Sequence, residues 1–340
     1  MKRLLSSLPW LLLALTTSLW VFWGVSEMYY EGWGLPFPQP LAYLLPGAVC
    51  LAFTGLALWR PGWGGGLLLL SGSLFTLWWW GMAWRRGGLT WGSALAMFPV
   101  SGLLILVGAL LLKAPSPEHQ GKRWGGLPWQ VWLTLGAPLL LAAGVSGAWL
   151  PVLLTRYDDG QRGARLIQGN GVALIWAPAG PGWNWKQPWG GYPSWDSLAR
   201  YGRPPVGLKV GAALGTGHAS QAEMATYGLC AYLSADGRRL LSEPQHTWRL
   251  PTVEEIVRSL PHDGHLAGCS LPPGARRAQC LQRPDKEAPL WAPDQPPIYY
   301  WAEEAFNATE AWYVSYLGRV SHQDKGWGNP RHGYRCVREP

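Results

Sequence analysis

The chain has 340 residues, a length that is enough for one large or two medium domains. Of these residues 48% are hydrophobic, and the formal net charge is +8. Its Lys and Arg residues are scattered, and the part after Leu154 is only mildly basic. This distribution argues against nucleic acid as a partner. The apolar residues are concentrated before residue 155, so we divide the chain into a membrane domain, 1–154, and a second domain, 155–340.

Five apolar segments fill the first domain, near 9–25, 41–59, 66–84, 95–112 and 131–154. Each is close to the roughly 20 residues that cross a bilayer as a helix. The basic start followed by an apolar run is also typical of a signal peptide, but bulky Trp20, Phe22 and Trp23 stand where a small-residue cleavage site would lie. We therefore expect a retained first helix and a multi-pass α-helical membrane region of about five transmembrane helices.

Tryptophans lie near the ends of these segments, where an indole ring favours the headgroup level. They are Trp10, Trp20, Trp23, Trp59, Trp84, Trp129 and Trp149. We interpret the run Trp78-Trp79-Trp80 as bulk that faces lipid or packs between helices, with a pigment or quinone contact as the weaker alternative.

The orientation in the membrane is predicted from the basic residues of the short loops. Those on one side are Lys2, Arg3, Arg60, Lys113, Lys122 and Arg123, and those on the other are Arg85 and Arg86. The side with more basic residues is expected to be cytoplasmic. Five crossings then place the second domain outside the cytoplasm, whereas a re-entrant segment would place it inside.

The cysteines give an independent indication of compartment. Cys50 lies in an apolar segment, and the other four, Cys230, Cys269, Cys280 and Cys336, all follow residue 154. An even number is typical of two disulfides in an oxidising compartment. We therefore expect a protein of the inner cell membrane with a cytoplasmic N-terminus and a periplasmic or extracellular C-terminal domain.

The second domain begins with a polar, Gly-containing linker, 155–165, followed by a predicted strand at 171–176. Residues 178–217 are dense in Gly, Pro and Trp, including Trp183, Trp185, Trp189 and Trp195. We interpret them as long loops held by buried indoles, although such a surface could equally bind a flat apolar group or a sugar ring.

Two capped helices are predicted next. Ser220 and Glu223 form a capping box for a helix that ends at Asp236-Gly237, and Thr252 and Glu255 form a second one for a short helix with an apolar stripe from Val253 to Leu260. The loop 261–297 holds Cys269 and Cys280 and is expected to be closed by a local disulfide.

Aromatic strands are predicted late in the chain. A strand at 298–301 precedes a hairpin, in which 311–316 and 319–322 meet at the turn Leu317-Gly318, and a last strand covers 333–338. Because a cysteine of the first helix can then meet one in the last strand, we pair Cys230 with Cys336 and Cys269 with Cys280.

The order of motifs over residues 165–340 resembles the Lcl C-terminal domain family, which has an α+β, C-type-lectin-like fold. The residues that carry the resemblance are Leu174-Ile175-Trp176, 225–233, 248–255, Tyr300-Trp301, 311–314 with Gly318, and 335–338. Ala302-Glu303-Glu304 stand where the family usually has small hydroxyl residues, and the loop with Cys269 and Cys280 looks like an insertion. The resemblance implies extracytoplasmic binding or adhesion and covers none of the membrane domain.

The related formylglycine-generating enzymes share this broad fold and use a reactive cysteine pair near the C-terminus. Here only Cys336 lies in that region, and we assign it to a disulfide, so we do not expect an enzyme.

Two sets of residues are candidate metal ligands. His262, His265, Cys269 and Cys280 are ligand types that zinc prefers, and the acidic residues Asp285, Glu287, Asp294, Glu303 and Glu304 are types that calcium prefers. For the first set we expect a disulfide with exposed histidines, and for the second solvated charge. No metal or cofactor is therefore predicted.

The predicted ligand surface lies on the late loops and comprises Trp291, Tyr299, Trp301, Glu303, Asn307, Trp327, Asn329 and His332. The competing interpretation places Trp301 and Trp312 in the core. The leading hypothesis is a membrane-anchored module that recognises a protein or glycan. In a variant of this hypothesis, the C-terminal strands form a binding surface with a diversified sequence. The alternatives are a structural accessory subunit of a membrane complex and, more weakly, a formylglycine-generating-type enzyme.

Overall fold

The computed structural model describes residues 2–85, 90–114, 123–124, 127–187, 190–204, 206–207 and 217–340. Arg86 and Lys122, used above to predict orientation, and Trp189 of the Trp-rich loop lie outside these ranges. The chain divides into two compact units, Met1–Leu153 and Leu154–Pro340.

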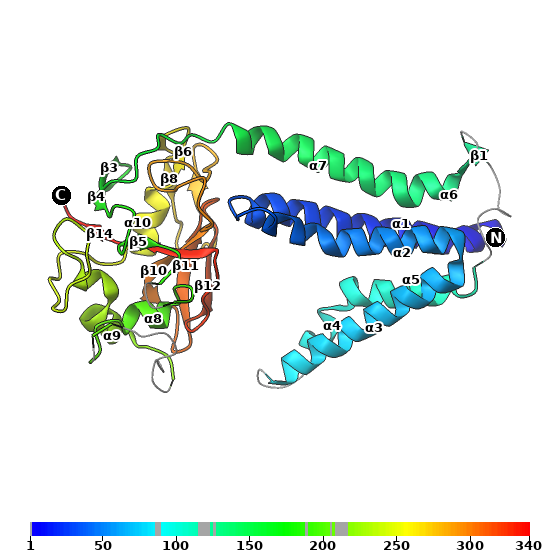
Figure 1. Ribbon diagram of the computed structural model, residues 1–340, viewed down its shortest axis with the longest axis horizontal. Coiled ribbons are helices and arrows are strands. Elements are labelled where there is room, and N and C mark those ends of the chain that lie inside the picture. The colour runs from blue at the N-terminus through cyan, green and yellow to red at the C-terminus, as the bar shows by residue number, and fades with distance from the viewer. Residues whose placement is uncertain are drawn as a thin grey trace. The chain divides into compact units, whose positions relative to one another are not determined.

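The first unit is helical (Figure 1). Its α-helices are α1 (Lys2–Glu27), α2 (Leu45–Trp59), α3 (Pro61–Arg85), α4 (Trp91–Leu95), α5 (Leu103–Leu111), α6 (Trp129–Val131) and α7 (Ala137–Leu154). Short π-helical turns at Met28–Gly32, Phe98–Gly102 and Trp132–Gly136, and a 3₁₀ turn at Gln39–Leu44, extend them. Two short strands, β1 (Arg123–Trp124) and β2 (Leu127–Pro128), pair with each other.

Four helical runs in the described residues are long and apolar enough to cross a membrane: Ser7–Gly32, Gln39–Trp59, Pro61–Trp84 and Trp129–Leu154. The fifth predicted segment, 95–112, forms the shorter apolar helix Phe98–Leu111. Ala96 and Met97 form a turn after α4, and Pro99 lies in the next helical turn. Proline has no amide proton, so Pro99 cannot donate the hydrogen bond to Leu95 that a helix continuing from α4 would need.

Small residues bring α3 and α5 into close contact. A Cβ built on Gly65 would lie 2.8 Å from the Gly108 carbonyl oxygen, and one on Gly108 would lie 2.6 Å from the Gly65 carbonyl oxygen. Nearby, the Thr76 hydroxyl donates to the Ser101 hydroxyl at 2.7 Å. Glycine contacts and hydroxyl bonds of this kind hold helices together where no water is present.

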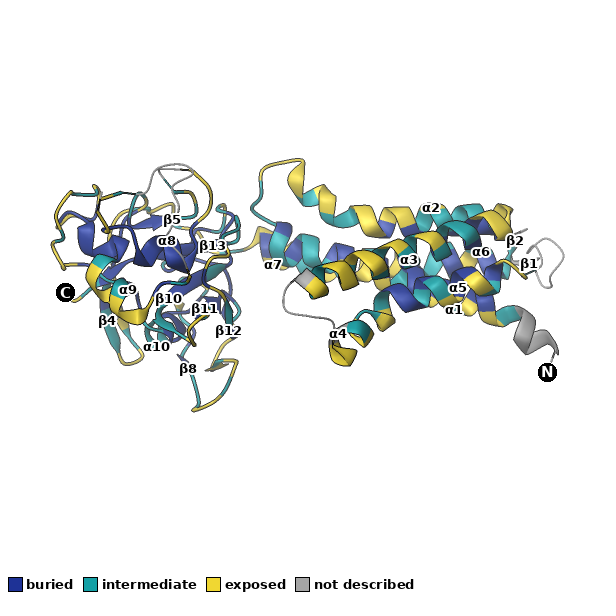
Figure 2. Ribbon diagram, turned by 90° about the horizontal axis from the view of Figure 1, so that it is seen from below, coloured by how far each residue is buried: buried dark blue, intermediate teal, exposed yellow. Residues whose placement is uncertain are grey.

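The tryptophans near the segment ends divide into two groups. Trp59 and Trp84 are exposed on the helical unit, as rings at a headgroup level would be, but Trp10 and Trp20 are buried in its core with Leu13. These two rings therefore pack against neighbouring helices. Trp78 and Trp80 are exposed on α3, and Figure 2 shows exposed residues along this helix, as expected for side chains that face lipid or a partner.

The second unit is built around two small sheets (Figure 1). The five-stranded sheet has the order β12-β11-β10-β13-β5 and contains β5 (Trp183–Asn184), β10 (Tyr299–Ala305), β11 (Glu310–Ser315), β12 (Val320–Asp324) and β13 (His332–Arg335). The three-stranded sheet has the order β14-β4-β3, with β3 (Arg165–Gly169), β4 (Val172–Trp176) and β14 (Val337–Arg338). The β10–β13 pair is parallel and the other pairs are antiparallel.

The predicted hairpin, β11 with β12, is confirmed. The predicted last strand divides at Cys336, so that β13 and β14 join different sheets. The predicted linker, which ends at about residue 165, is followed directly by β3, which begins at Arg165. Asn170-Gly171 joins β3 to β4 as a two-residue turn with φ angles of 50° and 82°, the conformation that Asn-Gly favours between antiparallel strands.

Three short helices accompany the sheets: α8 (Trp195–Ala199), α9 (Gln221–Tyr227) and α10 (Val253–Arg258). Both predicted capping boxes are confirmed, with the Ser220 and Thr252 side chains each accepting from the amide three residues on at 3.2 Å. The predicted extent of the first of these helices is wrong, because α9 ends at Tyr227. Gly228 is extended, with ψ of 138°, and Leu229–Tyr232 form a 3₁₀ turn.

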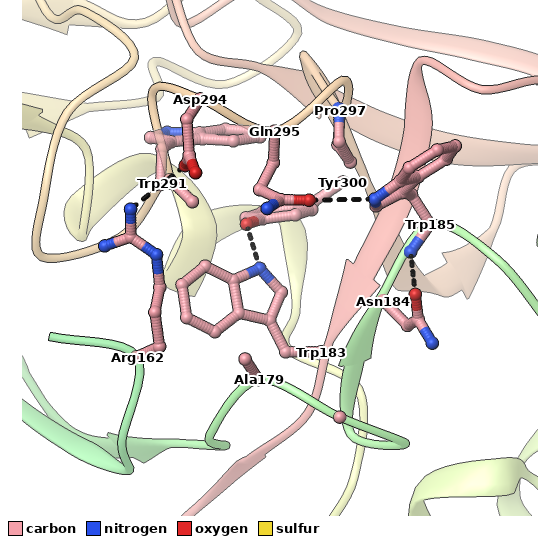
Figure 3. A pocket seen from close by; sticks show the side chains of 12 residues that line it. Arg162, Ala179, Trp183, Asn184, Trp185, Trp291, Asp294, Gln295, Pro297 and Tyr300 are labelled. Carbon is pink, nitrogen blue, oxygen red and sulfur yellow. Dashed lines mark hydrogen bonds and ion pairs between the residues drawn. The ribbon is translucent and has the colours of Figure 1, made fainter. Parts of the chain in front are cut away.

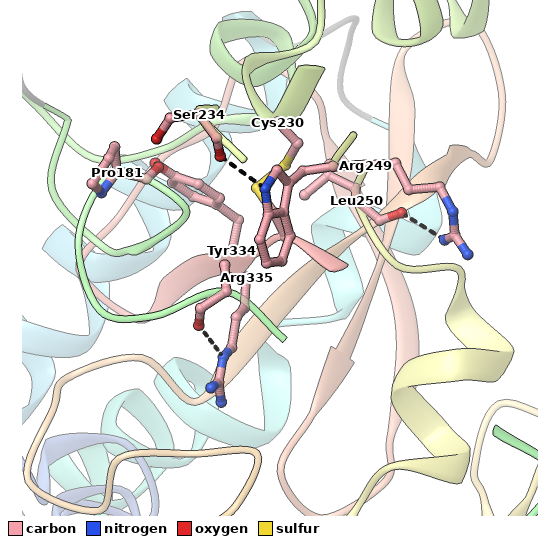
Figure 4. The surroundings of a disulfide bond; sticks show 10 residues. Pro181, Cys230, Ser234, Arg249, Leu250, Tyr334 and Arg335 are labelled. Carbon is pink, nitrogen blue, oxygen red and sulfur yellow. Dashed lines mark hydrogen bonds between the residues drawn. A yellow bond between two sulfur atoms is a disulfide. The ribbon is translucent and has the colours of Figure 1, made fainter. Parts of the chain in front are cut away.

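The loop 261–297 contains two small hairpins, β6 (Pro261–His262) with β7 (His265–Leu266) and β8 (Cys269–Ser270) with β9 (Gln279–Cys280). The Cys269–Cys280 disulfide joins β8 to β9, and the Cys230–Cys336 disulfide joins the 3₁₀ turn to the end of β13. This is the pairing expected from the sequence. Figure 4 shows the surroundings of Cys230, where the Trp248 indole donates to the Ser234 carbonyl at 3.0 Å.

Candidate functional site

Five of the eight predicted ligand residues meet around the imidazole of His332. The Tyr299 and Trp301 ring centroids both lie 4.8 Å from that of His332, and the Trp327 centroid lies 5.7 Å away. The Asn329 Oδ1 atom is 3.2 Å from His332 Nδ1. The sequence therefore identified residues that are neighbours in space.

This cluster is mostly interior. His332 is 2% exposed and Trp301 is fully buried, whereas Trp327 is 47% exposed. Burial, and then the charge of Arg331, lower the pKa of His332 to about 3. The cluster thus packs the end of β10 against β13 and offers one ring, Trp327, to solvent.

The other three predicted residues lie elsewhere. The Asn307 side chain accepts from the Thr309 and Glu310 amides at 2.8 Å and so forms the turn between β10 and β11. Glu303 lines a cavity of about 160 Å³ beside Trp248 and Arg249. Trp291 is buried and lines a larger pocket.

This larger pocket, the aromatic pocket, has a volume of about 310 Å³. That is at the lower end of the range for small-ligand sites, roughly 300–1,000 Å³. Its lining comes from the linker before β3, from the loop between β4 and β5, from β5 and the residue that follows it, from the segment 291–297 and from β10. The lining residues are Arg162, Ala179, Gly180, Trp183, Asn184, Trp185, Trp291, Ala292, Asp294, Gln295, Pro297 and Tyr300 (Figure 3).

Four aromatic side chains line the pocket in fixed orientations. The Trp291 and Tyr300 rings stack at a centroid distance of 3.9 Å and an angle of 7°. Trp183 Nε1 donates to the Tyr300 hydroxyl at 2.7 Å, and Trp185 Nε1 donates to Gln295 Oε1 at 2.9 Å. These bonds engage the polar atoms of Trp183, Trp185 and Tyr300, whereas Trp291 Nε1 is buried without a hydrogen-bond partner among the described residues. The rings are thus held in place and line the pocket with apolar surface (Figure 3).

The polar part of the lining carries charges of both signs. Arg162 Nη2 is 2.7 Å from Asp158 Oδ2 and 3.0 Å from Asp294 Oδ1, and the Asp294 side chain is 61% exposed. The hydrogen bond from Arg162 is the main cause that lowers the pKa of Asp158. The pocket therefore offers a solvent-facing carboxylate and a guanidinium next to its aromatic walls.

Two buried cations support the pocket from behind its lining. The Arg335 Cζ lies 3.7 Å from the Trp183 ring centroid, and this guanidinium donates to the Ala177, Pro289 and Leu290 carbonyls at 2.8–3.0 Å. Lys286 Nζ donates to the carbonyls of Pro293 and Gln295, within the segment that forms one wall. Burial is the first cause that lowers the pKa of Arg335 to about 9 and that of Lys286 to about 7. The pocket wall is thus held by hydrogen bonds to the backbone.

The metal alternatives find no support in the described residues. The sulfurs of Cys269 and Cys280 are bonded to each other, so neither is a thiolate ligand for zinc. Glu287 accepts from the Tyr157 and Asp263 amides, and Glu304 accepts from the Val253 amide. No group of three or more His, Cys, Asp or Glu side chains gathers in the part of the chain that the structure describes.

Sequence reasoning found part of the aromatic pocket. Trp183 and Trp185 lie in the Trp-rich stretch for which a flat apolar ligand or a sugar ring was an alternative, and Trp291 was among the predicted ligand residues. Arg162 and Gln295 were missed, because only the fold brings them next to Trp183 and Trp185. Comparison with known protein families, curated proteins and solved structures finds no significant match to this chain.

Proposed function

We propose that the C-terminal unit is a binding module of C-type-lectin-like architecture, anchored by the helical unit and exposed outside the cytoplasm, and that it binds one sugar unit of a glycan in the aromatic pocket. The observation that carries this proposal is the pocket itself. A sugar ring has apolar C–H faces and hydroxyl edges, which fit flat apolar walls with a few polar groups that fix orientation.

The membrane anchor is supported by four apolar helices of sufficient length. The run from Trp91 to Leu111 includes α4 and α5 and packs along α3. At about 1.5 Å per residue, the apolar helix Phe98–Leu111 covers about 21 Å, and α4, on the other side of the turn Ala96-Met97, adds about 7 Å toward the ~30 Å of a hydrocarbon core. We propose that it is the fifth crossing, which places the C-terminal unit on the side opposite the N-terminus. The two disulfides of this unit fit an oxidising compartment.

A test is to measure saccharide binding by the full-length protein in detergent or nanodiscs, with saturation-transfer NMR against a panel of neutral, amino and acidic sugars. We expect saturation transfer to the ring protons of at least one sugar. Trp185→Ala should abolish it, because this change removes one wall and releases Gln295.

The matched control is Trp327→Ala, which removes a half-exposed indole from the His332 cluster and leaves the aromatic pocket intact. Binding that survives Trp185→Ala but is lost in Trp327→Ala would move the site to the late loops. Binding of no sugar in the panel would contradict the proposal.

A further inference from the structure

A basic hairpin, residues 269–283, projects from the C-terminal unit. It carries Arg276, Arg277 and Arg283, and no Asp or Glu occurs anywhere from residue 264 to residue 284. All three arginines are exposed. The Cys269–Cys280 disulfide closes the hairpin. The sugar-binding proposal does not use this surface.

The fold adds a fourth arginine to this surface. Arg277 and Arg319 face each other in an antiparallel bridge, and hydrogen bonds from the Ala278 amide to the Gly318 carbonyl and from the Val320 amide to the Arg276 carbonyl fix the contact. Arg319 is exposed. Within the described residues, no ion pair engages Arg276, Arg277 or Arg319, although Glu310 lies close enough to Arg276 to interact with its charge. The surface is thus positively charged and open to an anionic partner.

An exposed apolar side chain stands in the same hairpin. Leu281 is 90% exposed, and it lies next to Gly268, on which a Cβ would approach the Leu281 side chain to 2.8 Å. An isolated exposed leucine is ordinary. Together with several arginines, however, it matches the combination that binds the interface of an anionic bilayer, in which basic groups meet headgroups and an apolar group enters the acyl boundary.

Chain connectivity indicates where this surface lies relative to the bilayer. Tyr157 follows the last residue of α7, Leu154, by three residues, a distance of at most ~11 Å even for extended chain. Arg156 pairs with Asp285 at 2.7 Å, and the Ala288 amide donates to the Tyr157 carbonyl at 3.1 Å. A Cβ on Gly264 would lie 2.7 Å from the Tyr157 ring. Gly264 and Asp285, which flank the basic hairpin in sequence, therefore both contact the first residues of the C-terminal unit. These first residues directly follow α7.

From these contacts we infer that the basic hairpin docks on anionic lipid headgroups at the surface of the bilayer from which α7 emerges, with Leu281 in the interface. The bilayer is the occupant that the charge, the exposed leucine and the connection to α7 favour together. This inference rests on the proposal that the helices cross a membrane, and it is independent of sugar binding.

The test places the photoreactive residue benzoylphenylalanine at position 281 of the full-length protein. The protein is reconstituted in nanodiscs of phosphatidylcholine alone or of an equimolar mixture with phosphatidylglycerol. We expect lipid adducts in the anionic nanodiscs, with a yield several-fold lower in neutral nanodiscs or at high salt. Arg277→Glu combined with Arg319→Glu should lower the yield to that of the neutral nanodiscs.

Arg238→Glu combined with Arg239→Glu is the matched control. These two arginines are exposed in a different turn, and their reversal should leave the yield unchanged. Three results would overturn the inference. The lipid-adduct yield could be equal in neutral and anionic nanodiscs, it could fall equally in the control variant, or adducts could form only with protein. The last outcome would indicate an acidic protein partner. Intact disulfides in each variant, checked by peptide mapping, confirm that a lower yield is not due to misfolding.

Discussion

The Arg335 guanidinium lies over the Trp183 indole, with Cζ 3.7 Å from the ring centroid, and it is fully buried. Its hydrogen bonds go to backbone carbonyls of three different residues, Ala177, Pro289 and Leu290. These carbonyls lie in the loop after β4 and in the loop before β10. One side chain near the end of the sequence thus joins two loops behind the aromatic pocket.

Arg335→Lys should destabilise the C-terminal unit by about 3 kcal/mol or more. The compact ammonium cannot reproduce the planar fork or its stacking on Trp183, and it leaves buried carbonyls without donors. The measurement is denaturant unfolding of the full-length protein followed by tryptophan fluorescence. Arg238→Lys, at an exposed position, should cost less than about 0.5 kcal/mol. Equal effects of the two substitutions would contradict this role of Arg335.

Raising the pH above neutral should stabilise the C-terminal unit through Lys286. Burial, and then the charge of Arg156, lower the pKa of this lysine from 10.5 to about 7. Between these values the unfolded chain binds a proton that the folded chain does not, so stability rises with pH. Below pH 7 both states are protonated, and the gain is absent.

The measurement compares the unfolding free energy at pH 7.0 and at a pH near 8.5, which stays below the lowered pKa of Arg335, about 9, and below the raised pKa values of the buried Tyr300 and Tyr334. We expect an increase of several kcal/mol at most, on the scale of about 1.4 kcal/mol per pKa unit. The increase should be absent in Lys286→Met. If the unfolding free energy of Lys286→Met still rises with pH as in the unsubstituted protein, Lys286 is not the source of the pH dependence.

The two disulfides should contribute unequally to stability. Cys230 and Cys336 are 106 residues apart and Cys269 and Cys280 are 11 apart. The chain-entropy estimate is therefore about 5 kcal/mol for the first and about 3 kcal/mol for the second. Replacing each pair by serine and measuring the unfolding free energy should reproduce this order. The reverse order would mean that local packing around β8 and β9 outweighs loop closure.

Gly65→Leu should disrupt the helical unit, because a side chain there meets the backbone of α5 at 2.8 Å. Overpacking of this kind costs about 1–3 kcal/mol or more. Gly66→Leu is a matched control one residue away, since a Cβ on Gly66 has no neighbour within 4 Å. Thermal unfolding in detergent should show a lower midpoint for the first variant only. Equal midpoints would argue against the close contact of α3 with α5.

Local signals in the sequence predicted a good part of the fold. Ser220 with Glu223 and Thr252 with Glu255 gave correct helix starts, because a capping box is formed by residues three apart. The end of α9 was missed, since the residues after Gly228 continue an apolar helical pattern while the backbone turns to 3₁₀ geometry. The strand β3 was missed although Asn170-Gly171 is a strong turn signal, because only two of its five residues, Leu166 and Ile167, are apolar.

The site was less predictable than the fold. Aromatic residues in the late strands were recognised as a group, but their alternation does not reveal which ring faces the core, and Trp301 and His332 lie in the interior. The aromatic pocket joins Arg162 to Gln295 across 133 positions of sequence, since it forms only when the linker before β3 and the residues around β5 meet the segment 291–297. No local pattern encodes a contact of that range.

The proposed location outside the cytoplasm requires that the C-terminal unit folds in an oxidising compartment. Its most direct test is non-reducing peptide mapping of the full-length protein from intact cells whose free thiols are blocked before lysis. We predict the linked peptides Cys230–Cys336 and Cys269–Cys280, with Cys50 alone recovered as a free thiol. Recovery of all five cysteines as blocked thiols would contradict the account, because the C-terminal unit would then lie on the reducing side of the membrane.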